Sequence, residues 1–198
     1  MRTDFVKKMH AYACQNPALG TRRRVLTKGL YKYMEHKEIQ YQLVEKLIQL
    51  GWHISLAESC TGGKACGKIV DVADASKVLN ASLVTYANEA KETYLGVKRE
   101  TLETYGAVSE ETAYEMCRGI AERNGAELGI GITGLAGPGG GTAEKPVGMV
   151  CFGFCIQGHI YTETRQFGPI GRNAVREAAA EYALQRAYEL ISDIHIVA

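Results

Sequence analysis

The sequence predicts an α/β fold, in the form of a three-layer α/β/α sandwich around a mixed and mostly parallel sheet. Short apolar runs typical of strands alternate along the chain with longer segments whose apolar residues recur at helical spacing. Such alternation is typical of parallel strands joined by crossover helices. Two late apolar runs are separated only by Gln157 and Gly158, which predicts one antiparallel hairpin and therefore a mixed sheet.

Residues 1–36 differ from the rest and are expected to form a basic helical extension. They carry eight Lys and Arg residues against only Asp4 and Glu35, and Pro17 and Gly20 separate two weakly helical pieces. The segment is interpreted as a solvated helical extension or a dimerisation arm. A basic arm for phosphate-rich partners is the alternative, which predicts a salt-dependent nucleic-acid shift that is lost on deletion. Residues 37–198 then form the functional domain.

The first half of this domain begins with a core-facing helix over residues 37–50, whose apolar residues recur at helical spacing and which Gly51 ends. A short strand follows over residues 54–58 and breaks at Ser59. Small residues then lead into a helix at about 62–72. The β-branched and aromatic run 82–86 predicts the next strand, and residues 88–95 form a short helix before a glycine.

The second half begins with a helix over residues 109–124, for which Ser109 is a plausible N-cap. The apolar run 128–133 predicts a third buried strand, and the glycine-rich residues 134–142 predict a loop. The last elements are the hairpin strands and an amphipathic helix, at residues 147–156, 159–167 and 172–192.

Composition excludes several functional classes. The chain is 46% hydrophobic and 23% charged with a net charge of +1, so nucleic acid and membranes are not expected as partners. It has no run of 18 apolar residues and no signal-peptide pattern, so a cytoplasmic location is expected. The six cysteines form no C-x-x-C pair and have no histidine at metal spacing, which predicts reduced thiols, no metal and no cofactor. A homo-oligomer is expected, with a dimer as the favoured form.

The strand-to-helix turn at Ser59-Cys60-Thr61-Gly62-Gly63 is the first candidate for chemistry. A helix that begins there is expected to leave N–H groups unpaired beside hydroxyls, and such a place accepts an anion or stabilises an oxyanion. The alternative is that the Ser or Thr hydroxyl merely caps the helix. A nucleotide-binding P-loop is not supported, because Ile69 stands where Ser or Thr must reach magnesium.

A nucleophilic Ser59 needs a base, and Lys91 is the best candidate. Ser-x-x-Lys is absent at Ser59, and the histidines do not lie at positions typical of a triad. A desolvated lysine can act as a base because burial lowers its pKa. The alternative for Lys91 is a surface ion pair with Glu89 or Glu92. In open α/β sheets ligands bind beyond the carboxyl ends of the strands, where the candidates from three strand ends would converge. These candidates are Ser59, Tyr86, Asn88, Lys91, Thr133 and Gly134.

The glycine-rich loop that follows Thr133 has two interpretations. It is either a plain surface connection, or a backbone that lets substrate approach closely and supplies N–H groups at Gly137 and beyond to a phosphate or acyl oxygen. Its place after a strand end favours the second.

Six motifs in order resemble the CinA C-terminal-domain family in its stand-alone form, over about residues 37–193. The motifs are AESCTGG at 57–63, TYANEAK at 85–91, LGV at 95–97, GAVSE at 106–110, GITGLAGPGG at 131–140 and EKPVG at 144–148. The resemblance implies an α/β/α fold. It also implies a metal-free amidase that converts nicotinamide mononucleotide to nicotinate mononucleotide and ammonia in pyridine nucleotide salvage.

Carried over residue by residue, the resemblance implies that Ser59 is the nucleophile, Lys91 its base and Tyr86 an aid to positioning or proton relay. The implied substrate-binding residues are Thr61, Gly62, Asn88, Thr133, Gly134, Gly137 and Arg172. The closing family motif Phe-x-Gly-Asp-Arg-x-x-Val-Arg departs here, because the matching segment from Phe167 to Arg176 lacks the Asp and is one residue longer before Arg172. A second hypothesis is a non-catalytic nucleotide-binding or interaction module of the competence/damage-inducible type, in which the same groups only hold a phosphate.

Overall fold

The structure, a computed structural model, describes residues 38–192. The predicted basic extension over residues 1–36 lies outside the described residues, as does Cys14. No helix in the described part of the chain combines the length and the apolar character needed to span a membrane.

Five strands form one sheet in the order β2-β1-β3-β4-β5. Strand β1 pairs in parallel with both β2 and β3, whereas β4 pairs antiparallel with β3 and β5. Four strands therefore run in one direction and β4 alone opposes them, so the predicted mixed sheet is confirmed. The strands are β1 (Ile54–Glu58), β2 (Leu79–Val84), β3 (Leu128–Gly134), β4 (Met149–Ile156) and β5 (His159–Gln166).

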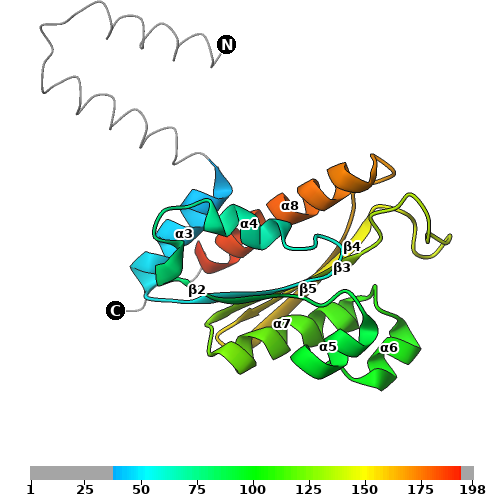
Figure 1. The fold of residues 1–198 in the computed structure, drawn as a ribbon, viewed down its shortest axis with the longest axis horizontal. Coiled ribbons are helices and arrows are strands. Elements are labelled where there is room, and N and C mark those ends of the chain that lie inside the picture. Colours follow the sequence, from blue (N-terminus) through cyan, green and yellow to red (C-terminus); the bar gives the residue numbers. More distant parts are fainter. Residues whose placement is uncertain (1–37, 193–198) are drawn as a thin grey trace, which may run out of the picture. The chain divides into compact units, whose positions relative to one another are not determined.

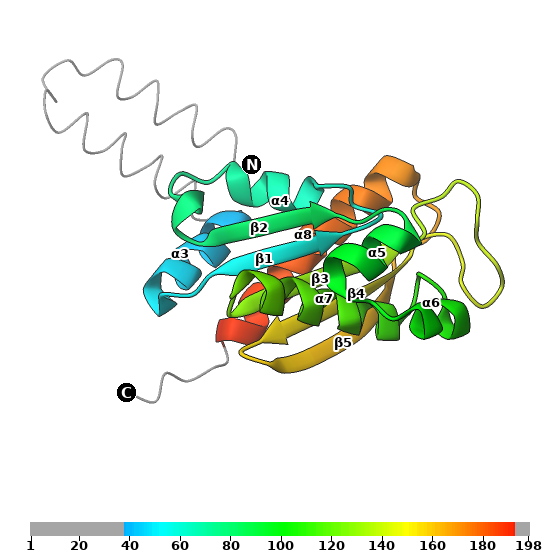
Figure 2. The same cartoon turned by 60° about the horizontal axis from the view of Figure 1, so that its bottom comes forward.

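Helices cover both faces of the sheet, which confirms the three-layer sandwich (Figure 1). Helices α3, α4 and α8 lie on one face, and α5, α6 and α7 lie on the other (Figure 2). The helices are α3 (Ile39–Leu50), α4 (Lys64–Val70), α5 (Asn88–Leu95), α6 (Arg99–Tyr105), α7 (Glu110–Asn124) and α8 (Arg172–Ser192).

Each face of the sheet has its own apolar core, because successive side chains of a strand point to opposite faces. In β1, Leu56 joins the cluster under α3 and α8, whereas its neighbour Ala57 joins the cluster with Leu95 and Met116. The side chains of Leu56 and Ala57 are both fully buried. The two cores fix β1 from both sides and so fix the strand end that carries the site.

Helix α7 approaches the sheet closely because glycines lie beneath it. A Cβ atom at Gly131 would lie 2.7 Å from the Ala113 carbonyl oxygen, and one at Gly153 would lie 2.3 Å from the same atom. Side chains at these strand positions would displace α7.

The structure differs from the prediction at β2 and at α6. Strand β2 ends at Val84, so Thr85 and Tyr86 follow it instead of completing it. Helix α6 was not predicted. Its first turn is fixed from another helix, since the Glu115 carboxylate of α7 accepts hydrogen bonds from the Lys98 N–H and the Thr101 hydroxyl.

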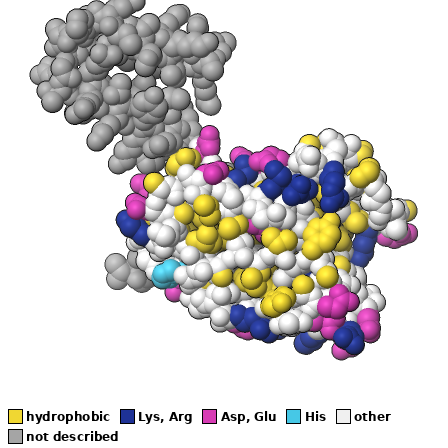
Figure 3. Space-filling model, in the orientation of Figure 1, with side chains coloured by type: hydrophobic (Ala, Val, Ile, Leu, Met, Phe, Trp, Pro, Cys, Tyr) yellow, Lys and Arg dark blue, Asp and Glu magenta, His cyan; other side chains and the backbone are white. Residues whose placement is uncertain are grey.

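Surface charge is mixed on the face drawn in space-filling form. Figure 3 shows apolar, acidic and basic side chains interspersed over this face.

Candidate active site

Ser59 is the first residue beyond β1, at the carboxyl end of the strand. Its N–H donates to the Ile132 carbonyl of β3 at 2.9 Å, and its own carbonyl accepts from the Gly62 N–H at 3.1 Å. The first bond continues the sheet pairing and the second closes a tight turn. The partly exposed hydroxyl therefore stands at the sheet edge where the sequence predicted a site.

Lys91 reaches Ser59 from α5. Its Nζ lies 3.3 Å from Ser59 Oγ and donates to the carbonyls of Thr85 at 2.8 Å and Tyr86 at 3.3 Å. The residue is only 1% exposed. The ion pairs among residues 38–192 do not include Lys91, and Glu92 pairs instead with Arg99 at 3.1 Å. The alternative of a surface ion pair for Lys91 is therefore wrong.

Burial controls the charge of Lys91. Removal of water is the larger effect and lowers the pKa of this amine below its ordinary value, whereas the neighbouring Cys60 acts in the opposite direction. The three contacts of Nζ are neutral oxygen atoms, which do not compensate an ammonium as a carboxylate would. The arrangement therefore favours a neutral amine next to a hydroxyl, which can take the hydroxyl proton.

Local structure explains how α5 delivers this amine. The Thr85 N–H donates to the Glu58 carbonyl at 2.9 Å, which extends the pairing of β2 with β1 by one residue. Helix α5 starts three residues later, and Lys91 and Leu95, four residues apart, share its buried face. Lys91 thus points back toward the end of β1.

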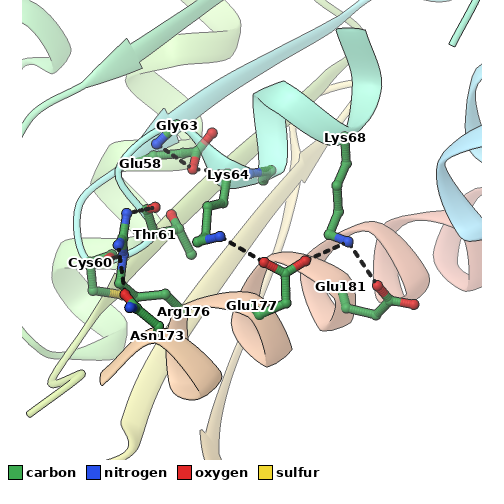
Figure 4. A network of polar contacts seen from close by, with 11 residues as sticks. Glu58, Cys60, Thr61, Gly63, Lys64, Lys68, Asn173, Arg176, Glu177 and Glu181 are labelled. Carbon is green, nitrogen blue, oxygen red and sulfur yellow. Dashed lines mark hydrogen bonds and ion pairs between the residues drawn. The ribbon is translucent and has the colours of Figure 1, made fainter. Parts of the chain in front are cut away.

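The start of α4 corrects one prediction. The Glu58 carboxylate, which is fully buried, accepts from the Gly63 N–H at 2.9 Å (Figure 4). It also accepts from the N–H groups of Ala65 at 3.2 Å and Cys66 at 2.8 Å. These helix N–H groups were expected to be unpaired. The alternative that a Ser or Thr hydroxyl caps this helix is also wrong. The Glu58 carboxylate accepts the hydrogen bonds of the helix N–H groups, and the buried Thr61 hydroxyl has no hydrogen-bond partner.

Arg176 of α8 contacts the same turn and was not among the predicted site residues. Its Nε donates to the Cys60 carbonyl at 3.0 Å and its Nη2 to the Thr61 carbonyl at 2.9 Å (Figure 4). The next residue of α8, Glu177, forms ion pairs with Lys64 and Lys68 of α4. The two lysines lower the pKa of Glu177 to about 2. Arg176 is the last residue of the closing family motif, but no local pattern in the sequence links it to residues 60 and 61.

Three predicted residues from separate segments meet at the start of α8. Arg172 donates through Nη1 to the Gly137 carbonyl at 2.8 Å and through Nη2 to the Tyr86 hydroxyl at 3.0 Å. The Tyr86 side chain is 63% exposed, so its hydroxyl bonds Arg172 while its backbone carbonyl bonds Lys91. Arg172 thus joins the glycine-rich loop to the segment that follows β2.

The remaining predicted residues lie at the same edge of the sheet, and Gly62 contacts Ser59 through the backbone hydrogen bond described above. Thr133 is buried and its hydroxyl donates to the Ala107 carbonyl at 2.6 Å. Gly134 ends β3 beside Val150, Asn88 is exposed at the start of α5, and Gly62 is exposed within the turn.

Cysteine chemistry is not supported next to Ser59. Cys60 is 5% exposed, and burial raises its pKa to about 12. The thiol therefore stays protonated at neutral pH. The five described cysteines are all free, as predicted.

Comparison with known proteins identifies the family. Residues 36–191 match the family model of the CinA C-terminal domain. The chain belongs to this family. The CinA-like protein of Kosmotoga olearia is 49% identical over 157 residues, which are 79% of this chain and 38% of that protein. The chain thus spans little more than a third of this longer relative.

Members of similar length also match the chain. A protein of Enterobacter agglomerans named nicotinamide-nucleotide amidohydrolase PncC is 44% identical over 151 residues, which are 76% of this chain and 92% of that protein. Among solved structures, the competence/damage inducible protein CihA of Agrobacterium tumefaciens has a TM-score of 0.76 at 40% identity, over 79% of this chain and 95% of its own. ComA of Klebsiella pneumoniae has a TM-score of 0.77 at 34% identity, over 80% and 98%.

Proposed function

We propose that the chain is an amidohydrolase that converts nicotinamide mononucleotide to nicotinate mononucleotide and ammonia, with Ser59 as nucleophile and Lys91 as base. The observation that carries this proposal is the buried Lys91 amine 3.3 Å from the Ser59 hydroxyl. The relative of similar length that is named for this activity supports the choice of substrate.

The proposed reaction proceeds through an acyl-enzyme. The Ser59 oxygen attacks the carboxamide carbon while its proton passes to the neutral Lys91 amine. The carbon–nitrogen bond then breaks, and Lys91 returns the proton to the departing ammonia. A water molecule, deprotonated by Lys91, next attacks the ester and releases the carboxylate, which restores the Ser59 hydroxyl.

The nucleotide part of the substrate is assigned to the groups around this pair. Arg172, together with Tyr86 and Gly137 to which it is hydrogen-bonded, forms the proposed wall of the binding site next to Lys91. The guanidinium of Arg172 suits a phosphate. Proposed further contacts are the backbone at Thr61 and Gly62 and the residues Asn88, Thr133 and Gly134.

Substitution of the two central residues tests the proposal through ammonia release from nicotinamide mononucleotide. We expect Ser59→Ala to lower kcat/KM on the order of 10⁴-fold, and Lys91→Ala to behave similarly, because each removes one partner of a single proton transfer. Chelators should leave the wild-type rate unchanged. Ser76→Ala is the control, since Ser76 is an exposed serine outside the site.

Two results would contradict the proposal. Turnover by Ser59→Ala at the wild-type rate would show that Ser59 is not the nucleophile. Binding of the mononucleotide by the wild-type protein without ammonia release would instead support the non-catalytic binding module.

A further inference from the structure

The backbone that follows Ser59 is held from α8 by a single side chain. Arg176 donates through Nε to the Cys60 carbonyl and through Nη2 to the Thr61 carbonyl, at 3.0 and 2.9 Å. Its third nitrogen, Nη1, donates to the Asn173 side-chain oxygen at 3.2 Å, one turn earlier on the same helix. The three contacts fix the plane of the guanidinium and aim it at the turn (Figure 4).

These contacts remove the freedom of two peptide groups. Because a trans peptide is planar, a fixed carbonyl also fixes the direction of the N–H that follows it. The bonds from Arg176 therefore set the peptide planes between Cys60 and Thr61 and between Thr61 and Gly62. The next N–H groups along the chain are held by Glu58. The turn is thus fixed by an anion on its N–H side and a cation on its carbonyl side.

Only an arginine at position 176 can hold both carbonyl groups of the turn. Two donors on one rigid plane reach two successive carbonyls, whereas a lysine offers one compact ammonium that cannot keep both bonds at this geometry. Arg176 forms no ion pair with any of residues 38–192. Its hydrogen-bond acceptors are neutral oxygen atoms. A Cβ atom at Gly62 would lie 3.1 Å from Arg176 Nη2, so the side chain lies directly against the turn.

We infer that Arg176 is a positioning residue, which holds the Ser59 turn so that the hydroxyl stays within reach of the Lys91 amine. This inference rests on the proposed amidase function. The Ser59–Lys91 distance is already 3.3 Å, at the long end for a hydrogen bond, so a small shift of the turn would break it. A misplacement of about 1 Å at a reacting centre can cost about 10²-fold in rate.

The kinetic test compares Arg176→Lys and Arg176→Ala with wild type. We expect kcat for ammonia release to fall roughly 10- to 100-fold while KM changes much less, because the Ser59 turn moves but the proposed wall of Tyr86, Gly137 and Arg172 is untouched. Added guanidinium ion should restore part of kcat in Arg176→Ala and have no such effect on wild type. Arg186→Ala is the matched control, since Arg186 lies on the same helix but pairs with Glu163 and Glu189.

A second measurement separates this inference from the proposed function. A fluorophosphonate probe reacts with an activated serine as the Oγ–P bond forms, fluoride leaves and Lys91 takes the proton, so its rate reports the Ser59–Lys91 pair without the natural substrate. We expect the Arg176 variants to label Ser59 at least about 10-fold more slowly than wild type and Arg186→Ala.

If wild-type protein labels but releases no ammonia, the proposed substrate fails and the labelling rates still test Arg176. Labelling of Arg176→Ala at the wild-type rate would overturn the inference. A raised KM with unchanged kcat would overturn it as well, since Arg176 would then bind substrate.

Discussion

At the scale of single residues, burial of Lys91 affects both the stability of the fold and the proposed reaction. An ammonium has three donors and is strongly hydrated in water, yet Lys91 is 1% exposed and bonds only neutral oxygen atoms. A group of this kind costs folding free energy in its charged form. The same desolvation lowers its pKa and supplies the neutral amine that the proposed reaction needs.

The lowered pKa predicts a pH-dependent stability difference between wild type and Lys91→Met. Between the folded-state pKa of Lys91 and its ordinary value near 10.4, the unfolded chain holds a proton that the folded chain lacks. Stability therefore rises with pH in this window. Relative to Lys91→Met, the wild-type free energy of unfolding should rise by up to about 1.4 kcal/mol per pH unit there.

Urea unfolding at a series of alkaline pH values measures this difference. Lys98→Met is the control, because Lys98 is an exposed lysine. A Lys91→Met curve that runs parallel to the wild-type curve across the window would show that burial does not shift the Lys91 pKa.

At the scale of elements, α4 depends on a residue that precedes it. Helix N–H groups are usually satisfied by a side chain at the N-cap, but here the N-cap is Gly63 and the acceptor is Glu58, the last residue of β1. One buried carboxylate thus joins a strand to the helix that follows and encloses the Ser59 turn between them.

Glu58→Gln should therefore destabilise the protein by about 2–3 kcal/mol. The amide keeps one oxygen but turns an NH₂ donor toward a backbone N–H that has lost its acceptor. The control is Glu111→Gln, which replaces an exposed carboxylate in the first turn of α7 and should cost less than about 0.5 kcal/mol. Urea unfolding compares the two, and equal losses would show that burial of Glu58 adds nothing.

The elements themselves were largely predictable where local signals exist. The predicted helix 172–192 has the observed bounds, and Ser109 caps α7 by accepting from the Thr112 N–H as expected. The hairpin turn is formed at Gln157 and Gly158, whose φ angles of 48° and 85° suit a two-residue turn. Helix α6 was missed because its start depends on Glu115, which lies in another helix.

At the scale of the whole molecule, the sequence predicted which strand ends meet and the pair Ser59 and Lys91, but not the arginine contacts that join these segments. The ends of β1, β2 and β3 converge because parallel strands share one carboxyl edge, so Ser59 and Lys91 could be placed together. The bonds from Arg176 to residues 60 and 61 span more than a hundred positions along the chain and leave no local pattern. The bond from Arg172 to Tyr86 spans 86 positions and likewise leaves no local pattern.

The site also depends on the layer beneath it, since α5 carries Lys91 and rests on α7. The contact is closest at Gly119 in the middle of α7, where a Cβ atom would lie 1.8 Å from the carbonyl oxygen of Leu95. Leu95 is the last residue of α5, one turn after Lys91. The absence of a side chain at Gly119 therefore sets how closely α5 approaches, and through it the position of the Lys91 amine.

Gly119→Ala should accordingly lower both stability and turnover. The added methyl group must separate α5 from α7, at a cost of about 3 kcal/mol, and draw Lys91 away from Ser59. Gly67→Ala is the matched control, because Gly67 lies inside α4 with nothing within 4 Å of its Cβ position. There the same change should stabilise the protein by about 0.5–1 kcal/mol through helix propensity. Urea unfolding and ammonia release, measured below the unfolding transition of both variants, give the comparison. If Gly119→Ala kept wild-type turnover, the packing of α5 on α7 would not set the distance between Lys91 and Ser59.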